Sequence, residues 1–307
     1  MASSRLLSVR NLSTHFFLYK GILKVVDNIS FDIKEGEIFG LIGESGSGKT
    51  VTAFSILRLI EGPGKIVGGN VWLKDRDILR LSEKDMTDIR GKKISMIFQQ
   101  AKTALNPFMK IGDQIGRVYK VHEALDDKEA RRKAIEILMK TGIAAASERA
   151  LNYPHQFSGG MCQRAMIAMM TSCSPELLIA DEPTTGLDVM TQSQILDLMK
   201  EIRDKQSCSI LLITHDLGIV AQTCDRVAVM HAGHIVEIAD LNAIFEKPIH
   251  PYTIGLIESI PRHDKKVIIK GISGSVPNLL NISPKCRFSG RCPEEMPACS
   301  KMTPPII

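Results

Sequence analysis

Four short apolar runs, each unbroken by polar alternation, most constrain the fold of this 307-residue chain. They are "EIFGLIG" (37–43), "KISMIFQ" (93–99), "PELLIAD" (175–181) and "SILLITH" (209–215). Amphipathic helical patterns stand between them, as in "DKEARRKAIEILMKTGI" (127–143). A strand that is apolar on both faces must be covered on both faces, so the alternation predicts a parallel sheet flanked by helices. The predicted fold class is therefore α/β.

The remaining segments predict further strands, a helical region and a C-terminal extension. Extended patterns cover 6–16, 23–33 and 65–75, and a mostly helical pattern covers about 107–172. The stretch "RVAVMHAGHIVEI" (226–238) predicts a β-hairpin with Ala232 and Gly233 in its turn. After about Lys247, prolines become frequent and periodicity fades. We therefore expect a large domain at 1–247 and a C-terminal extension at 248–307.

Composition and charge narrow the function classes. Apolar residues make up 44% and charged residues 24%, which is typical of a soluble globular protein. The net charge of +5 suits anionic partners such as nucleotide phosphates, but no long basic run or basic–aromatic patch indicates nucleic acid. No segment reaches the ~18–20 apolar residues of a membrane span, and "MASSRLLSVRNLS" is too short and polar for a signal peptide. We expect a cytosolic protein that reaches a membrane only through a partner.

The stretch "GESGSGKT" (43–50) fits the pattern G-x-x-x-x-G-K-[ST], with Gly43, Gly48, Lys49 and Thr50 in the fixed places. Glycines let the backbone wrap a phosphate, and the following helix directs its positive end at the anion. Lys49 adds charge near the β- and γ-phosphates, and the Thr50 hydroxyl can ligate Mg²⁺. The alternative is a glycine-rich turn that binds nothing, but the strand before it and the helix after it favour a nucleoside triphosphate.

Polar side chains end two of the apolar runs. Asp181 and Glu182 close "ELLIADE", where parallel sheets bind ligands. We expect Asp181 to hold Mg²⁺ through water and Glu182 to polarise the attacking water as a general base. His215 closes the neighbouring run and can hydrogen-bond the γ-phosphate. The alternative is two solvated acids and a packed histidine.

The stretch "HQFSGGMCQ" carries a second helix start suited to an anion, formed by Ser158, Gly159 and Gly160. One chain has no second nucleotide for it. We therefore expect a head-to-tail pair, in which this loop covers the γ-phosphate held by the glycine loop of the partner.

Taken together, residues 5 to about 245 resemble the ATP-binding subunits of ABC transporters. "GESGSGKT" resembles Walker A, "LLIADE" Walker B and "FSGGMCQ" the signature, in which Phe157, Met161 and Cys162 depart from the usual residues. "TTGLD" resembles the D-loop, and "MIFQQAKTALNP" the Q-loop, with Gln100-Ala101 in place of the frequent Asp-Pro. The resemblance implies a P-loop NTPase fold with a RecA-like core, an antiparallel β subdomain and a helical signature subdomain.

The resemblance also implies roles for individual residues. The catalytic set is Lys49, Gln99, Glu182 and His215, and the Mg²⁺ ligands are Thr50, Gln99 and Asp181. The other nucleotide contacts are implied for Gly43, Glu44, Ser45, Gly46, Ser47, Gly48 and Val51, for Ser158, Gly159, Gly160 and Gln163 of the signature, and for Asp188 at the intersubunit position. Adenine is expected to stack on Phe16, with the nearby Phe17 and Tyr19 in the core.

Two later segments resemble the oligopeptide, dipeptide and nickel importer subfamily, namely "HPYTIGLIESIP" (250–261) and the tail "KCRFSGRCPEEMPAC". This implies an ATPase at the cytoplasmic face of the membrane that powers import of dipeptides or oligopeptides. The implied partners are a sister or identical ATPase, two integral membrane permease subunits and an external binding protein. A nickel-chelate importer, a soluble ABC ATPase acting on ribosomes or DNA, and a non-catalytic scaffold remain alternatives.

The tail cysteines Cys286, Cys292 and Cys299 are spaced C-x5-C-x6-C. In some members of the subfamily the resemblance implies a [4Fe–4S] cluster, which needs four thiolates. This chain supplies three, so the fourth is expected downstream of Ile307. A cysteine-only zinc site and free thiols are the alternatives. The four other cysteines are expected to be free thiols: Cys162, Cys173, Cys208 and Cys224.

Overall fold

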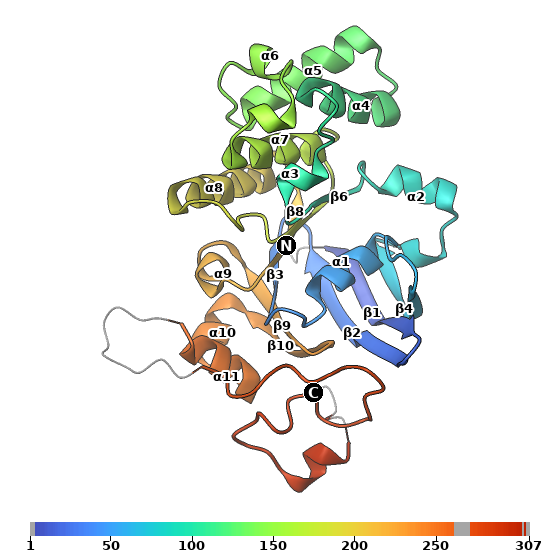
Figure 1. Ribbon diagram of the computed structural model, residues 1–307, viewed down its shortest axis with the longest axis vertical. Helices are drawn as coiled ribbons and strands as arrows, with labels where there is room; N and C mark the ends of the chain where they lie inside the picture. Colours follow the sequence, from blue (N-terminus) through green and yellow to red (C-terminus); the bar gives the residue numbers. More distant parts are fainter. Residues whose placement is uncertain (1–3, 261–270, 303, 305–307) are drawn as a thin grey trace. The chain divides into compact units, whose positions relative to one another are not determined.

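The structure is a computed structural model that describes residues 4–260, 271–302 and 304 (Figure 1). The chain divides into two compact units, and each is described by itself. The first unit contains the described residues of 1–6, 34–37 and 81–212, and the second contains those of 7–33, 38–80 and 213–307.

An antiparallel sheet forms one part of the second unit. Its strands lie in the order β2-β1-β4-β5, with bounds β1 (Arg5–Leu18), β2 (Gly21–Lys34), β4 (Gly64–Leu73) and β5 (Arg76–Asp77), followed by the 3-10 turn η1 (Ile78–Arg80). The β1–β4 register sets Phe16 opposite Gly64. The strands predicted at 6–16, 23–33 and 65–75 are confirmed.

The second unit also contains the strand that leads into the glycine loop. Strand β3 (Ile38–Ile42) is buried throughout and runs parallel to β9 (Arg226–His231), which pairs antiparallel with β10 (His234–Asp240). The φ angles of Ala232 and Gly233 are 48° and 88°, so the turn of the predicted hairpin is confirmed. The helices of this unit are α1 (Lys49–Ile56), α9 (Leu217–Thr223), α10 (Leu241–Glu246) and α11 (Pro251–Glu258).

Buried parallel strands form the base of the first unit. Strand β6 (Ile94–Ile97) pairs parallel with β7 (Leu177–Asp181), and β8 (Ser209–Thr214) follows β7 in the sheet order and runs on into the second unit. Every residue of these three strands is buried. This burial explains why the sequence shows unbroken apolar runs here, and the predicted parallel pairing is confirmed for β6 and β7.

Helices make up most of the first unit. Figure 1 shows α4 (Ile111–Glu123), α5 (Asp127–Lys140), α6 (Ala146–Arg149) and α7 (Gly159–Thr171) gathered in one group, which confirms the predicted helical region. The others are α2 (Glu83–Ile89), α3 (Ala101–Ala104), η2 (Pro154–Gln156) and α8 (Val189–Gln206). Within the described ranges, no helix of either unit combines the length and the apolar character needed to traverse a bilayer.

The C-terminal extension belongs to the second unit and packs against β2 and the turn between β9 and β10. Asn281 donates its backbone N–H to the carbonyl of Ile22 at 2.8 Å, and its side-chain oxygen accepts the N–H of Ile22 at 2.9 Å. Arg287 donates to the carbonyl of Ala232 at 2.6 Å and pairs with Asp27. A short 3-10 helix, η3 (Pro297–Ser300), closes the segment.

Helix α11 was not predicted from the sequence. Its first residue is Pro251, and the Nδ1 atom of His250 accepts the backbone N–H of Tyr252 at 3.1 Å, which caps the helix start. The helix has only eight residues and is apolar on several sides, so it lacks the periodic pattern of a longer amphipathic helix. Pro261, the last residue of the "HPYT" segment, lies outside the described residues.

Candidate functional site: a phosphate loop and the polar ends of buried strands

The glycine loop between β3 and α1 requires its glycines for two different reasons. A Cβ at Gly43 would lie 2.0 Å from the carbonyl oxygen of Met230, and a Cβ at Gly48 would lie 2.6 Å from that of Val25. Gly46 faces open space, but its φ of 79° is one that other residues rarely adopt. Close packing and positive φ angles of 151° and 109° together select glycine at 43 and 48, whereas at 46 the backbone conformation alone selects it.

The lysine of the loop is held by the loop itself. The Nζ atom of Lys49 donates to the carbonyls of Gly43 at 2.7 Å and Glu44 at 3.0 Å, and lies 3.4 Å from the Ser47 hydroxyl. The hairpin supports the same loop, since Gly233 donates its N–H to the carbonyl of Ser47 at 2.8 Å. Thr50 is exposed at the first turn of α1. This arrangement fits the expected cradle for phosphate, with a fixed ammonium and an accessible hydroxyl.

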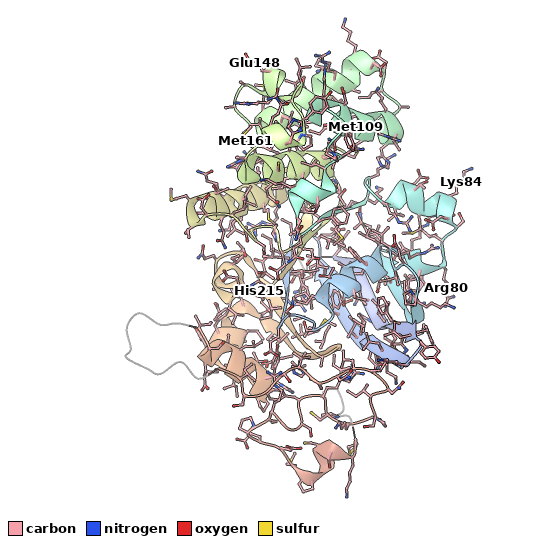
Figure 2. All side chains as sticks on the ribbon, viewed as in Figure 1. Arg80, Lys84, Met109, Glu148, Met161 and His215 are labelled. Carbon is pink, nitrogen blue, oxygen red and sulfur yellow. The ribbon has the colours of Figure 1, made fainter. Side chains whose placement is uncertain are left out.

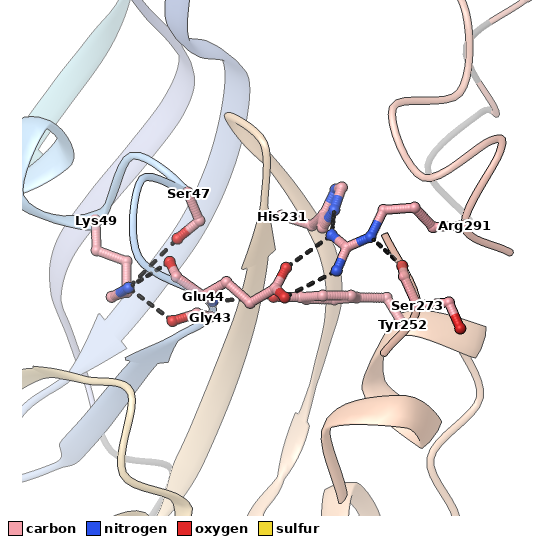
Figure 3. A network of polar contacts seen from close by, with 8 residues as sticks. All are labelled: Gly43, Glu44, Ser47, Lys49, His231, Tyr252, Ser273 and Arg291. Carbon is pink, nitrogen blue, oxygen red and sulfur yellow. Dashed lines mark hydrogen bonds and ion pairs between the residues drawn. The ribbon is translucent and has the colours of Figure 1, made fainter. Parts of the chain in front are cut away.

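Glu44, the second residue of the loop, lies in a polar network that the sequence did not reveal (Figure 3). Both of its carboxylate oxygens accept hydrogen bonds from Arg291 of the extension, each at 2.8 Å. Its backbone N–H donates to the hydroxyl of Tyr252 at 3.0 Å. The hydrogen bonds from Arg291 hold the pKa of the Glu44 carboxyl below its usual range. The carboxylate is therefore ionised and paired at neutral pH.

His215 follows the last residue of β8 and is exposed (Figure 2). The turn beneath it is fixed by the next residue, because Asp216 caps α9 by accepting the N–H groups of Gly218 at 2.8 Å and Ile219 at 3.2 Å. The imidazole therefore projects from a defined turn at the carboxyl end of a buried strand.

Two of the three aromatic residues near the end of β1 differ from expectation. Phe16 is half-buried, and a Cβ on the facing Gly64 would lie 2.8 Å from its ring. Phe17 is 43% exposed and Tyr19 is fully exposed. The expectation that Phe17 and Tyr19 lie in the core is wrong, because β1 extends past the buried part of its sheet. Phe17 instead lies under the ammonium of Lys65, at 5.8 Å from the ring centre.

In the first unit, the acidic pair lies where β7 ends. Asp181 is the final strand residue and is 2% exposed. Glu182 has a φ of 51°, a left-handed conformation that is uncommon for a residue other than glycine and is associated with functional positions. Its carboxylate accepts the hydroxyl of Thr185 at 2.8 Å. The chain thus turns sharply at Glu182, immediately after the buried carboxylate.

The signature segment forms the start of α7. The Ser158 hydroxyl caps the helix by accepting the N–H of Met161 at 3.3 Å, and Figure 2 shows Met161 at this end of the helix. Ser158 is exposed, whereas Gln163 is 4% exposed. Cys162 is fully buried, with its thiol 3.6 Å from the carbonyl of Pro154, so this departure from the usual signature lies inside the helix packing.

Two further predicted residues lie on exposed connections of the first unit. Asp188 caps α8: one carboxylate oxygen accepts the N–H of Thr191 at 2.9 Å and the other accepts its hydroxyl at 2.7 Å. Gln99 is exposed just after β6. The predicted site residues therefore divide between the units. Those of the glycine loop, Phe16 and His215 lie in the second unit, and Gln99, the signature, Asp181, Glu182 and Asp188 lie in the first.

The three tail cysteines do not support the predicted [4Fe–4S] cluster. Cys286, Cys292 and Cys299 are half-buried free thiols, and the backbone N–H of Cys286 donates to the carbonyl of Cys299 at 2.9 Å. In the part of the chain that the structure describes, no three or more His, Cys, Asp or Glu side chains are arranged to hold a metal ion. A cubane cluster needs four thiolates and a structural zinc site needs four ligands, and the described residues assemble neither set, so the structure supports neither group.

Comparison with known proteins identifies the class to which this geometry belongs. Residues 26–185 match the ABC transporter family, which covers the glycine loop, the signature and the acidic strand end. Residues 236–299 match a second family described as the oligopeptide/dipeptide transporter C-terminal region. The chain belongs to the ABC transporter family and is an ATPase of that class.

Individual relatives are similar in sequence over nearly the whole length of this chain. It is 48% identical to the oligopeptide transport ATP-binding protein AppD of Bacillus subtilis (strain 168), over 99% of this chain and 93% of the relative. It is also 48% identical to the dipeptide transport ATP-binding protein DppD of the same organism, over 98% and 90%. Among solved structures, the ATP-binding cassette MJ0796, a dimer bound to ADP and Pi, is 27% identical with a TM-score of 0.69, over 76% of this chain and 98% of that one.

Proposed function

We propose that this chain is the ATP-hydrolysing subunit of an importer for dipeptides or oligopeptides. The observation that carries the proposal is that one chain combines an ABC transporter cassette with a C-terminal region of the oligopeptide/dipeptide type. Full-length similarity to ATP-binding proteins of oligopeptide and dipeptide transport supports the same cargo class. On this support we take peptides, rather than a nickel chelate, as the imported molecule.

The proposed nucleotide site begins at the glycine loop. Backbone N–H groups of 43–50 and the ammonium of Lys49 bind the β- and γ-phosphates, and Phe16 stacks on the adenine. The hydroxyl of Thr50, the carboxylate of Asp181 and the amide oxygen of Gln99 are the oxygen donors that Mg²⁺ prefers, so these residues fit the ion. When bound there, Mg²⁺ would supply positive charge that offsets the negative charge of the phosphates.

The remaining polar residues serve the attacking water. Glu182 accepts a proton from the water, and its place directly after the strand that ends in Asp181 supports this role. His215 donates a hydrogen bond to the γ-phosphate from its fixed turn. Together with Lys49, these groups stabilise the charge that develops in the transition state.

The proposal requires two ATPase subunits. The exposed start of α7, with the Ser158 hydroxyl and the amides of Gly159 and Gly160, faces the γ-phosphate bound to the partner subunit, and Asp188 lies at the contact between the two chains. The dimer of the related cassette bound to ADP and Pi supports this arrangement. The full assembly includes two integral membrane permease subunits and an external binding protein, and the ATPase pair attaches to the permeases at the cytoplasmic face.

The variant Glu182→Gln tests the catalytic assignment. It keeps the size of the side chain but removes its basicity, so ATP binding persists, turnover falls at least about 100-fold and closed dimers accumulate. Size-exclusion chromatography with ATP and a phosphate-release assay measure the two effects. The matched variant Glu176→Gln changes a half-buried carboxylate that pairs with Lys93 outside the site, and it leaves turnover within about twofold. Turnover by Glu182→Gln near the wild-type rate would falsify the base assignment.

The cargo is tested with the complete transporter in proteoliposomes. ATP-driven uptake of labelled dipeptides or oligopeptides supports the proposal. Uptake of a nickel chelate without peptide uptake contradicts the peptide assignment. Co-purification with ribosomes and not with membrane subunits contradicts transport altogether.

A further inference from the structure

An ion pair between Glu44 and Arg291 links the glycine loop to the C-terminal extension, and the proposed chemistry does not use it. The two residues are 247 positions apart in sequence and meet through two hydrogen bonds of 2.8 Å (Figure 3). A carboxylate is an unfavourable group in a loop that binds a triphosphate, because like charges repel across a few ångströms. Something must therefore offset the charge of Glu44 before ATP binds.

Arg291 is built to hold that carboxylate in one orientation. Its side chain is 6% exposed, whereas that of Glu44 is 29% exposed. Its Nε donates to the carbonyl of Ser273 at 2.9 Å, and its Nη1 also lies 3.1 Å from the Nε2 atom of His231. The ring of Phe288 lies 5.8 Å from the guanidinium. Because these contacts already fix the guanidinium, Arg291 binds both carboxylate oxygens without ordering a flexible side chain. A bidentate pair of this kind is the strongest form of an arginine–carboxylate interaction.

The same loop residue is tied at its backbone. Its N–H donates to Tyr252, which is fully buried on α11, and its carbonyl accepts the ammonium of Lys49 at 3.0 Å. Glu44 is thus held at its carboxylate and its N–H by residues after position 247, and at its carbonyl by the lysine of the loop. The contacts of this one residue connect the extension to the phosphate-binding lysine.

We propose that Arg291 is a positioning residue for ATP binding. It neutralises Glu44, turns the carboxylate toward the extension and fixes the loop before the phosphates arrive. The inference rests on the proposed role of the glycine loop, and it assigns the C-terminal extension a part in nucleotide affinity in addition to any role in transport.

A double-mutant cycle with fluorescent-ATP titrations tests this role. In Arg291→Gln, the unpaired carboxylate repels the phosphates, and ATP affinity falls about tenfold, which corresponds to ~1.4 kcal/mol. In Glu44→Gln/Arg291→Gln, no such charge remains, and the affinity returns to within about threefold of that of Glu44→Gln. A purely structural role for Arg291 would not be rescued by removing the carboxylate.

Arg287→Gln is the matched control. Arg287 is also a buried arginine of the extension, but it pairs with Asp27 and the hairpin turn and not with the loop. Thermal melts follow the folding of every variant, and this control keeps ATP affinity within about twofold because the pair between Glu44 and Arg291 stays intact. If Arg291→Gln does not fold, Arg291→Lys provides the comparison, because it keeps the positive charge and loses the bidentate guanidinium. We expect Arg291→Lys to reduce ATP affinity about threefold, and we expect no such loss when Glu44→Gln is also present.

The outcomes separate the inference from the function on which it rests. Unchanged affinity in Arg291→Gln, a loss that persists in the double variant, or an equal loss in Arg287→Gln overturns the role of Arg291. Failure of the wild-type protein to bind ATP, or equal binding by Lys49→Ala, overturns instead the assignment of the glycine loop as the nucleotide site.

Discussion

The hydroxyl of Tyr252 accepts the backbone N–H of Glu44 at 3.0 Å, which attaches the first helix of the C-terminal extension to the phosphate loop. Tyr252 is fully buried and packs edge-on against His231, with ring centres 4.4 Å apart. Burial raises the pKa of its phenol, so the hydroxyl stays neutral. A neutral hydroxyl accepts the backbone N–H without adding a charge beside Glu44 and Arg291.

Removing this hydroxyl tests the attachment. In Tyr252→Phe, the ring packing remains but the N–H of Glu44 loses its acceptor, so we expect a loss of ~1 kcal/mol in the free energy of unfolding and an ATP affinity reduced about two- to fivefold. Urea denaturation and nucleotide titration measure the two effects. Tyr153→Phe, a substitution in the other unit, is the control. Equal stability and affinity in Tyr252→Phe and wild type would show that the hydrogen bond contributes nothing.

The two kinds of glycine in the loop predict different costs of substitution. Gly43→Ala would drive a Cβ against the carbonyl of Met230, so we expect a loss of at least about 3 kcal/mol in the free energy of unfolding. Gly46→Ala meets no neighbour and costs only the ~1–2 kcal/mol of a left-handed alanine. Chemical denaturation of both variants checks the order, and a costlier Gly46→Ala would contradict the packing described for Gly43.

Stability should depend on pH through His231. Burial lowers the pKa of His231 to about 4, and the charge of Arg291 lowers it in the same direction. The charge of Glu44 raises the pKa, whereas His250 and His234 lower it further. Between about pH 6.5 and 4 the unfolded chain binds a proton that the folded chain excludes, so the free energy of unfolding decreases as the pH falls, by up to about 3 kcal/mol from this group. Melts of His231→Phe should show a flatter pH profile, and parallel profiles for variant and wild type would exclude this cause.

Six of the seven cysteines, all but Cys173, should fall into two reactivity classes. Cys162, Cys208 and Cys224 are buried, and burial raises the pKa of the Cys208 thiol to about 12. The half-buried tail thiols should react with a thiol reagent in the native protein, and the buried ones only after denaturation. Peptide mass mapping after timed labelling distinguishes them. Strong protection of all three tail thiols in the purified protein would contradict their description as free.

Sequence patterns predicted the elements around the phosphate loop well, because each signal there is local. The run "EIFGLIG", the glycine spacing and the following lysine are contiguous, and the parallel pairing of the later apolar runs follows from their burial. The caps by Ser158 and Asp188 are equally local, since each side chain accepts an N–H three residues ahead.

Long-range contacts could not be predicted in the same way. Nothing near Arg291 in the sequence indicates Glu44 as its partner, and a single chain offers no covariation between them. The exposure of Phe17 and Tyr19 was missed because an aromatic residue in a strand pattern is equally compatible with a core face and with a strand end. The [4Fe–4S] expectation came from the resemblance of the cysteine tail to an importer subfamily, and a resemblance in sequence does not establish that a set of four thiolates is assembled.

Because the Arg291 side chain is held in one position against Glu44, the extension cannot be exchanged freely between proteins. A chimaera that receives a foreign tail also receives a new group opposite Glu44. The contacts to the loop are kept only when the foreign tail places an arginine within hydrogen-bond distance of the Glu44 carboxylate. It must also place a hydroxyl where the backbone N–H of Glu44 can donate to it. Grafting experiments should therefore transfer the loop glutamate, the tyrosine and the arginine together as one unit.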